Sequence, residues 1–214
     1  MSLREPGRQV QRYGRRARSY DRETWLINAL IGRAWRRRLF DGASGRLLEV
    51  GVGTGGNFRF YPPALEAHAV DLTPAMVAVA EERASDLGTH VTLSAMDVCA
   101  LDFPDASFDR VVATCVFCSV PDPVAGFREL RRVLRPGGQV RLIEHMRPES
   151  RLLGPIFDRL DGPFYRRMGF HIARRTLGAI AEAGLAVRLD RVRLFGIFHY
   201  LELENGAGSS CAVS

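Results

Sequence analysis

The chain has 214 residues, of which 46% are hydrophobic, and its formal net charge is +6. This length and composition predict one globular domain with a well-buried core. No run of about 18 uncharged apolar residues is present, so no segment is expected to span a membrane, and the first residues lack the apolar core of a signal peptide. Four cysteines are too few for a disulfide scaffold, which favours a cytoplasmic protein.

The positive charge is concentrated in the N-terminal arm, where residues 1–40 hold eleven arginines and only three acids. Two helices are predicted here, over about residues 4–20 and 22–40. A helix turns by about 100° per residue, which separates two faces of the first helix. One face carries Arg4, Arg8, Arg12, Arg15 and Arg16, and the opposite face carries Val10, Tyr13, Ala17 and Tyr20.

A basic amphipathic helix followed by the apolar residues of 25–35 is typical of proteins that lie on an anionic membrane surface. The alternatives are an ordinary solvated helix packed on the core and a basic arm that holds nucleic acid. Tyr13 and Tyr20 lie opposite the arginines rather than among them, which argues against a stacking platform for bases. We therefore expect an anionic membrane surface as partner, and no nucleic acid.

A buried strand is predicted over 46–50, and it runs into a turn of alternating glycines, Gly51-Val52-Gly53-Thr54-Gly55-Gly56. Glycine has no Cβ, so such a turn lets the backbone approach a ligand closely. A second strand over about 67–71 ends in Asp71, whose carboxylate is placed to accept hydrogen bonds from ribose hydroxyls. Together these features predict a site for a nucleoside-containing cofactor.

The rest of the chain alternates helices and strands. Thr73 is the expected cap, and Pro74 the first residue, of the helix after the second strand. Strands are predicted over about 91–95, 109–114, 139–144, 186–194 and 197–203, helices over about 123–134 and 173–183, and a turn over 136–138. We expect an α/β fold: a Rossmann-like seven-stranded, mostly parallel sheet with an antiparallel C-terminal hairpin strand, plus N-terminal amphipathic helices. The predicted parts are an arm over 1–41, a main domain over 42–204 with a substrate insert near 146–172, and a disordered tail over 205–214.

A glycine-rich turn alone would also suit an NAD-binding domain, although here its spacing is Gly-x-Gly-x-Gly-Gly and it does not open the chain's first element. Further motifs follow it in order. They are Glu49-Val50-Gly51-Val52-Gly53-Thr54-Gly55, Val70-Asp71-Leu72 with Met76, Met96-Asp97-Val98, Phe103-Pro104-Asp105 with Phe108-Asp109, and Val133-Leu134-Arg135-Pro136-Gly137-Gly138. As a set they resemble the class I S-adenosylmethionine-dependent methyltransferases, over about residues 45–145.

The resemblance implies S-adenosyl-L-methionine as cofactor and S-adenosyl-L-homocysteine as product. The implied cofactor contacts are Glu49, Gly51, Gly53, Thr54 and Gly55 for the methionine side, Asp71 for the ribose, and Leu72, Met76, Asp97 and Val98 for the adenine. Asp97 alternatively caps a helix, and Leu72 and Met76 alternatively belong to the core. The segment from Tyr13 to Asp21 resembles the N-terminal lid of ubiquinone/menaquinone-type and phospholipid-type methyltransferases, which implies that Tyr13 and Tyr20 face the site and the arginine face looks outward.

Cys115 and Cys118 have C-x-x-C spacing, but neither Cys99 nor Cys211 supplies the second pair that a zinc site would need. We expect no metal and interpret both thiols as side chains that only fill space in the packing. By the resemblance, Cys115, Ser119 and Val120 lie near the methyl donor.

The motifs say less about the residues that bind the methyl acceptor. An amine acceptor must lose a proton, and the catalytic candidates are Tyr20, Glu144, His145 and His171. His145 is alternatively a capping residue. Arg174 and Arg175 are candidates to clamp a phosphate, or to be solvated residues of a first helical turn, and Tyr165 and His171 complete the predicted substrate contacts.

These features predict a methyltransferase that acts on a membrane phospholipid, converting phosphatidylethanolamine towards phosphatidylcholine. We expect a monomer that is peripheral on the inner face of the membrane. The alternative is the same chemistry on a small apolar acceptor, a quinone or a thiol, because Ser119-Val120 and Glu144-His145 also resemble small-thiol methyltransferase-like proteins.

Overall fold

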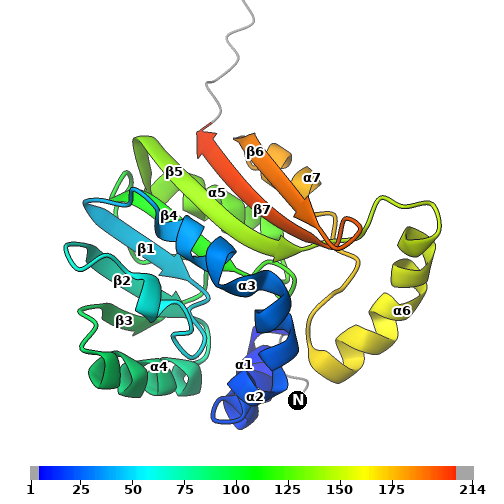
Figure 1. Cartoon of the computed structure of the whole chain (residues 1–214), viewed down its shortest axis with the longest axis horizontal. Coiled ribbons are helices and arrows are strands. Elements are labelled where there is room, and N and C mark those ends of the chain that lie inside the picture. Colours follow the sequence, from blue (N-terminus) through cyan, green and yellow to red (C-terminus); the bar gives the residue numbers. More distant parts are fainter. Residues whose placement is uncertain (1–4, 206–214) are drawn as a thin grey trace, which may run out of the picture.

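The computed structural model describes residues 5–205, which form one sheet with helices on both faces (Figure 1). The strands are β1 (Arg46–Val50), β2 (Glu66–Asp71), β3 (Thr92–Ala95), β4 (Phe108–Thr114), β5 (Leu134–His145), β6 (Leu185–Arg193) and β7 (Phe198–Asn205). The helices are α1 (Glu5–Arg16), α2 (Tyr20–Glu23), α3 (Trp25–Phe40), η1 (Phe58–Phe60), α4 (Pro74–Leu87), α5 (Pro123–Val133), α6 (Leu153–Met168) and α7 (Thr176–Glu182). None of the helices within this range is long and apolar enough to cross a membrane.

The sheet has seven strands in the order β3-β2-β1-β4-β5-β7-β6. All its neighbouring pairs are parallel except those of β7, which runs antiparallel to both β5 and β6. This confirms the predicted fold class, including the C-terminal hairpin. Parallel strands need a crossover between them, and the alternation of helices along the chain supplies it.

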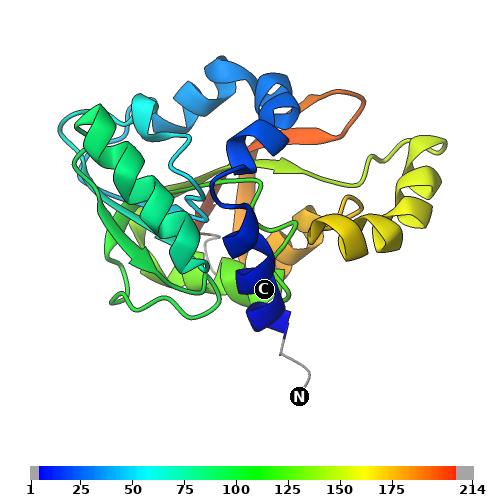
Figure 2. The same cartoon turned by 90° about the horizontal axis from the view of Figure 1, so that it is seen from below.

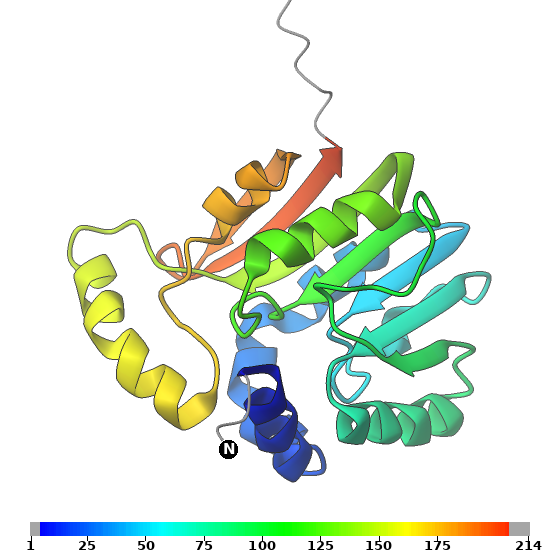
Figure 3. The same cartoon turned by 180° about the vertical axis from the view of Figure 1, so that it is seen from behind.

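Helices lie on both sides of the sheet, as the view from below shows (Figure 2). Apolar side chains pack between the sheet and these helices on each face. On one face, Trp35 and Leu39 of α3 pack with Tyr200 of the sheet. On the other, Phe127 of α5 and Ile180 of α7 join the larger cluster, and Figure 3 shows these two helices side by side. Burying each such side chain stabilises the fold by about 1.5–3 kcal/mol.

The predicted elements differ from the structure in several places. The turn predicted over 136–138 lies inside β5, which begins at Leu134. The arm has three helices rather than two, because the chain turns at residues 17–19 and again at Thr24, and Gly32 inside α3 has a non-helical φ of 76°. Thr73 occupies the N-cap position of α4, but its side chain makes no capping bond. The last helix begins at Thr176, not near 173, and Asn205, predicted to start the tail, ends β7. Arg4 and residues 206–214 lie outside the described residues.

The expectation that the arginine face of the arm looks outward is wrong for two of its residues. Arg12 donates to the carbonyls of Tyr165 and Arg166, at 3.4 and 3.1 Å, and Arg16 donates to that of Met168, at 3.3 Å. These carbonyls end α6, where the helix dipole places partial negative charge. Half-buried arginines of α1 therefore hold the end of α6 rather than facing solvent.

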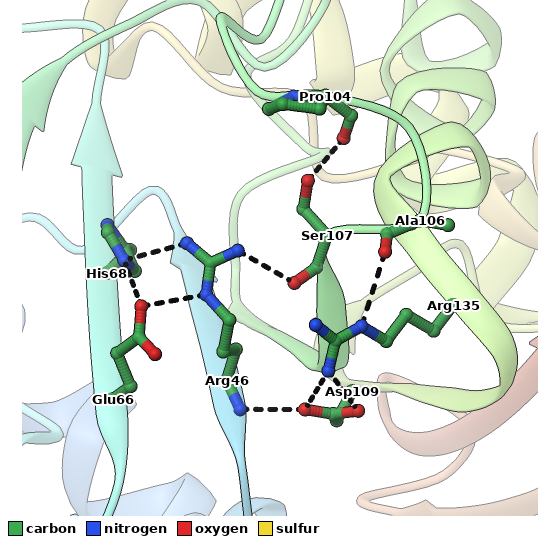
Figure 4. Close-up of polar contacts among 8 residues, drawn as sticks. All are labelled: Arg46, Glu66, His68, Pro104, Ala106, Ser107, Asp109 and Arg135. Carbon is green, nitrogen blue, oxygen red and sulfur yellow. Dashed lines mark hydrogen bonds and ion pairs between the residues drawn. The ribbon is translucent and has the colours of Figure 1, made fainter.

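The amino-terminal ends of β1 and β4 are joined by a polar network (Figure 4). Asp109 accepts two bonds from Arg135 and one from the backbone N–H of Arg46, each 2.8 Å long. The Arg46 guanidinium in turn donates to the carbonyl of Ser107, at 3.2 Å, and to Glu66, at 2.8 Å. The network fastens the loop before β4 to β1 and β2, at the edge opposite the carboxyl ends of the strands.

Replacing Asp109 with alanine should lower the free energy of unfolding by about 1–3 kcal/mol, since two donors lose their acceptor. Arg135 lowers the pKa of Asp109, so this stabilisation is present above the ordinary aspartate pKa and is lost as pH falls through the lowered value. Urea unfolding at neutral and acid pH measures the effect. Asp102→Ala, at an exposed acid of the same loop, is the control. An equal loss in both variants would contradict the assigned role.

Candidate functional site

A pocket lies at the carboxyl ends of the central strands, beneath α1 and α2. Most of the cofactor contacts implied by the sequence line it, and so do Tyr20 and His145 from the candidate catalytic set. These lining residues are Tyr13, Tyr20, Glu49, Gly51, Gly53, Thr54, Asp71, Leu72, Met76, Asp97, Val98, Cys115, Ser119, Val120 and His145. The described lining does not include Gly55, Glu144, Tyr165, His171, Arg174 or Arg175.

The glycine turn has the left-handed backbone that its residue types favour, with φ of 62° at Gly51, 56° at Gly53 and 76° at Gly55. A Cβ on Gly53 would meet no atom within 4 Å, so this backbone is open to the pocket. A Cβ on Gly55 would instead collide with the ring of Phe58. Gly55 therefore makes room for Phe58, and its expected contact with the cofactor stays a prediction.

Asp71 joins the glycine turn to the start of α4. Its two carboxylate oxygens accept from the backbone N–H groups of Gly53 and Thr73, at 3.0 and 2.9 Å. Burial raises the pKa of this carboxyl group, while the two backbone bonds favour the ionised form. Each oxygen can accept a further bond, so the carboxylate can take two neighbouring hydroxyls, as a ribose presents them.

A carboxylate and a guanidinium lie together in the part of the pocket that the sequence assigns to the methionine end of the cofactor. Glu49 accepts from Asn57 at 2.7 Å and from the Tyr61 hydroxyl at 2.6 Å, and burial raises its pKa to about 7. Arg36 donates to Asn57 at 2.5 Å and to Asn28 at 2.6 Å, and burial lowers its pKa. A carboxylate beside a guanidinium suits the ammonium and carboxylate of an amino acid.

Residues of α1 and α2 close one side of the pocket. Asp21 accepts from the Thr54 hydroxyl of the glycine turn at 2.5 Å and forms an ion pair with Arg83 of α4. Tyr13 and Tyr20 pack edge to face, with their ring centroids 6.2 Å apart. Burial raises the pKa of both phenols far above neutral pH, so each acts as a neutral hydroxyl rather than a base.

The adenine side is apolar, with a turn at its edge. Met76 and Val98 are buried and line the pocket. Asp97 also lines it, and its carboxylate accepts from the backbone N–H of Cys99 at 2.9 Å. Asp97 thus caps a local turn, not the helix that the alternative interpretation proposed, and its other oxygen is left for a ligand.

Glu144 and His145 end β5 below the pocket. One oxygen of Glu144 accepts from the N–H groups of Val116 and Phe117, at 2.8 and 3.0 Å, and its Oε2 is buried with no hydrogen-bond partner in the described structure. Nε2 of His145 lies 3.0 Å from the carbonyl of His171 and must donate to it, which leaves the lone pair on Nδ1. Burial lowers the pKa of His145, so the ring is neutral at pH 7.

Among the described residues, Cys118, Glu144 and His145 form a cluster whose candidate ligand atoms lie within 4.8 Å of one another. Thiolate, carboxylate and imidazole are all ligands of zinc. In this structure one oxygen of Glu144 already serves two backbone amides, and the Cys118 thiol lies 3.3 Å from the carbonyl of Cys115.

Replacing Glu144 with glutamine should make the free energy of unfolding less dependent on pH. Burial raises the pKa of Glu144 from 4.5 to about 7, so its favourable contribution is complete below 4.5 and is lost as pH rises through 7. The variant should therefore gain stability relative to the natural protein between pH 5 and pH 8, by about 1 kcal/mol or more. Urea unfolding at both pH values measures this, with Glu149→Gln, an exposed change, as control. A difference that does not vary with pH would contradict the assignment.

The predicted substrate residues gather beside the pocket rather than in its lining. His171 stacks on Tyr165, with ring centroids 4.2 Å apart, and pairs with Asp161 at 2.7 Å. Arg174 donates to the carbonyl of Val120 at 2.8 Å. Arg175 precedes α7 at its N-cap position. His171 positions His145 through its carbonyl, while a phosphate clamp by the two arginines stays a prediction.

Sequence reasoning missed Arg36, Asn57 and Asn28, which the fold brings to the pocket. Arg36 lies in the arginine run 36–38, and no local feature of the sequence distinguishes it from the other two. Gln9 was also missed; its amide donates to the carbonyl of Ser119 at 2.6 Å.

Comparison with known proteins agrees with this geometry. A family model described as a methyltransferase domain matches residues 48–142. The phosphatidylethanolamine N-methyltransferase of Cereibacter sphaeroides is 34% identical over 164 residues, which are 72% of this chain and 79% of that protein. The chain belongs to the class I S-adenosylmethionine-dependent methyltransferases. S-adenosylmethionine is therefore its methyl donor.

Other relatives of this methyltransferase differ in their acceptors. The human thiol S-methyltransferase TMT1A is 33% identical over 156 residues, which are 69% of this chain and 63% of that protein. The fold also matches the methyltransferase of a Haloferax volcanii complex with the Trm112 methyltransferase activator, with a TM-score of 0.72 and 16% identity over 96% of this chain and all of that one. At this identity the match shows the fold alone.

The site fits the donor by its chemistry. Asp71 suits the ribose hydroxyls, the pair of Glu49 and Arg36 suits the amino acid end, and the apolar residues beside Asp97 suit the adenine. The donor carries no phosphate, so its site needs no phosphate-binding group. The glycine turn instead offers open backbone at Gly53.

Proposed function

We propose that this methyltransferase methylates the amine of phosphatidylethanolamine, towards phosphatidylcholine. The observation that carries the proposal is the similarity to the Cereibacter sphaeroides enzyme, of which the chain covers 79%. The same site would need a base for an amine, and His145 presents a neutral imidazole to the pocket.

In this mechanism S-adenosylmethionine supplies an electrophilic methyl group when it is bound. The amine must first be neutral, and Nδ1 of His145 accepts its proton, because Nε2 is held by the carbonyl of His171. The free amine then displaces the methyl group from sulfur as the N–C bond forms and the S–C bond breaks. Tyr13 and Tyr20 cover the site and keep water out.

A small apolar acceptor, a thiol or a quinone, is the second candidate. The human thiol methyltransferase is 33% identical, close to the value for the lipid enzyme. Neutral His145 would take a proton from a thiol equally well. The two candidates differ in whether turnover needs a lipid.

The test is incubation of the purified protein with radiolabelled S-adenosylmethionine and vesicles of phosphatidylethanolamine and phosphatidylglycerol. Mono-, di- and trimethylated lipid should form, and vesicles without phosphatidylethanolamine are the control. If a small thiol or quinone is methylated without vesicles and the lipid acquires no label, the second candidate is favoured and the first is rejected.

A further inference from the structure

Helix α6 carries an apolar stripe on its outer surface. Leu152, Ile156, Leu160 and Phe164 are four residues apart, so they share one side of the helix. Their exposed fractions are 80%, 51%, 50% and 38%. Figures 1, 2 and 3 all show α6 standing away from the sheet, joined to it by extended segments at both ends.

The charges of α6 are divided between its two sides. Asp158 pairs with Arg147 through two bonds of 2.8 Å, and Asp161 pairs with His171, so both acids of the helix have partners outside it. Glu149, before the stripe, is an exposed acid, but four exposed residues beside the stripe or beyond its ends are basic. They are Arg151, Arg159, Arg166 and Arg167. The outer surface therefore combines an apolar stripe with flanking positive charge.

The β6–β7 hairpin places a second apolar group beside the segment that leads to α6. Phe195 at its tip is 83% exposed, and both Phe195 and Leu194 have left-handed backbone, with φ of 58° and 50°. This conformation is uncommon for large side chains and costs about 1 kcal/mol or more at each residue. Gly196 lies against Pro148, in the segment that leads to α6.

The carboxyl-terminal end of α6 reaches the pocket. Met168, the last residue of α6, and Phe170 both line the pocket. Arg12 and Arg16 hold the carbonyls at the same end of α6 to α1. A molecule lying on α6 would therefore meet the pocket where the arm covers it.

We propose that the outer surface of α6, with Phe195 at the hairpin tip, docks on an anionic phospholipid bilayer. Apolar side chains flanked by arginine are what an interfacial helix needs, because the arginines reach the headgroups while the stripe enters the acyl boundary. A second copy of the chain would suit the surface less well, since a two-fold interface would bring the same arginines together. The delivery of lipid to the pocket rests on the proposed function, whereas docking itself does not.

The test is flotation of the protein with vesicles of phosphatidylglycerol and phosphatidylcholine that lack phosphatidylethanolamine. The double variant Ile156→Glu/Leu160→Glu should bind at least about tenfold more weakly than the natural protein. Two apolar side chains that enter the bilayer in the proposed docking would then be charged. Leu87→Glu, at an exposed leucine of α4, should bind as the natural protein does. Affinity for S-adenosylhomocysteine and the thermal melt should be unchanged, which shows that the double variant is folded.

Unchanged vesicle binding by the double variant would overturn the proposal. So would a dimer of the natural protein that the double variant loses while neither floats with vesicles, since a second copy would then cover the surface. Because these vesicles contain no acceptor, a failure of lipid methylation leaves the docking result standing. Conversely, the double variant should still methylate a short-chain phosphatidylethanolamine in free solution if the proposed function holds.

Discussion

Replacing Asp71 with asparagine should weaken the binding of S-adenosylhomocysteine by about a hundredfold, because charge-assisted hydrogen bonds to a ligand contribute about 1.5–3 kcal/mol each. The carboxylate already holds the N–H groups of Gly53 and Thr73, so it is fixed in place before the ligand arrives. An asparagine can use only one oxygen, and its amide nitrogen would face one of these donors. Isothermal titration calorimetry measures the loss.

Asp86→Asn is the matched control, since it makes the same change on the exposed side of α4 and should leave the affinity unaltered. The natural protein should also lose affinity as pH falls, because burial raises the pKa of Asp71 and protonation removes the charge that accepts the hydroxyls. The asparagine variant should lack this dependence. A loss below about threefold in Asp71→Asn would show that the carboxylate does not receive the ribose.

The parts of the site that lie next to a strand in the sequence could be predicted. The turn at Gly51 and Gly53 and the acid at Asp71 each follow an apolar run, and parallel strands bring their carboxyl ends to one edge of the sheet. Local sequence therefore contains both the residue type and its position. The hairpin of β6 and β7 follows in the same way from a short connection between two apolar runs.

The parts that depend on distant segments could not be predicted. Arg36 reaches the pocket only because α3 packs on the sheet, and nothing in the run of arginines distinguishes it from its neighbours. Gly55 also leaves room for the ring of Phe58, a neighbour that the spacing of the glycines does not specify. The expected outward orientation is wrong for Arg12 and Arg16 for the same reason, because the carbonyls that accept from them end a helix about 150 residues away.

Replacing His145 with glutamine should lower kcat by about a hundredfold or more, with little change in the affinity for the donor product, because a positioned base contributes about that much. Glutamine can keep the bond from its amide nitrogen to the carbonyl of His171, which Nε2 of His145 makes at 3.0 Å, but it has no basic lone pair. His171→Gln is the companion variant. It leaves the backbone carbonyl in place, so it should change kcat far less.

The pH profile separates a base from a residue that only packs. Burial lowers the pKa of His145 from its ordinary value of 6.5, so the neutral, proton-accepting form persists below that pH. The acid limb of kcat/KM in the natural enzyme should accordingly lie below pH 6.5. In His145→Gln this limb should disappear, and the rate should recover as pH rises and the acceptor loses its own proton to solvent. A variant that keeps the acid limb would assign the proton to another group and leave His145 a packing residue.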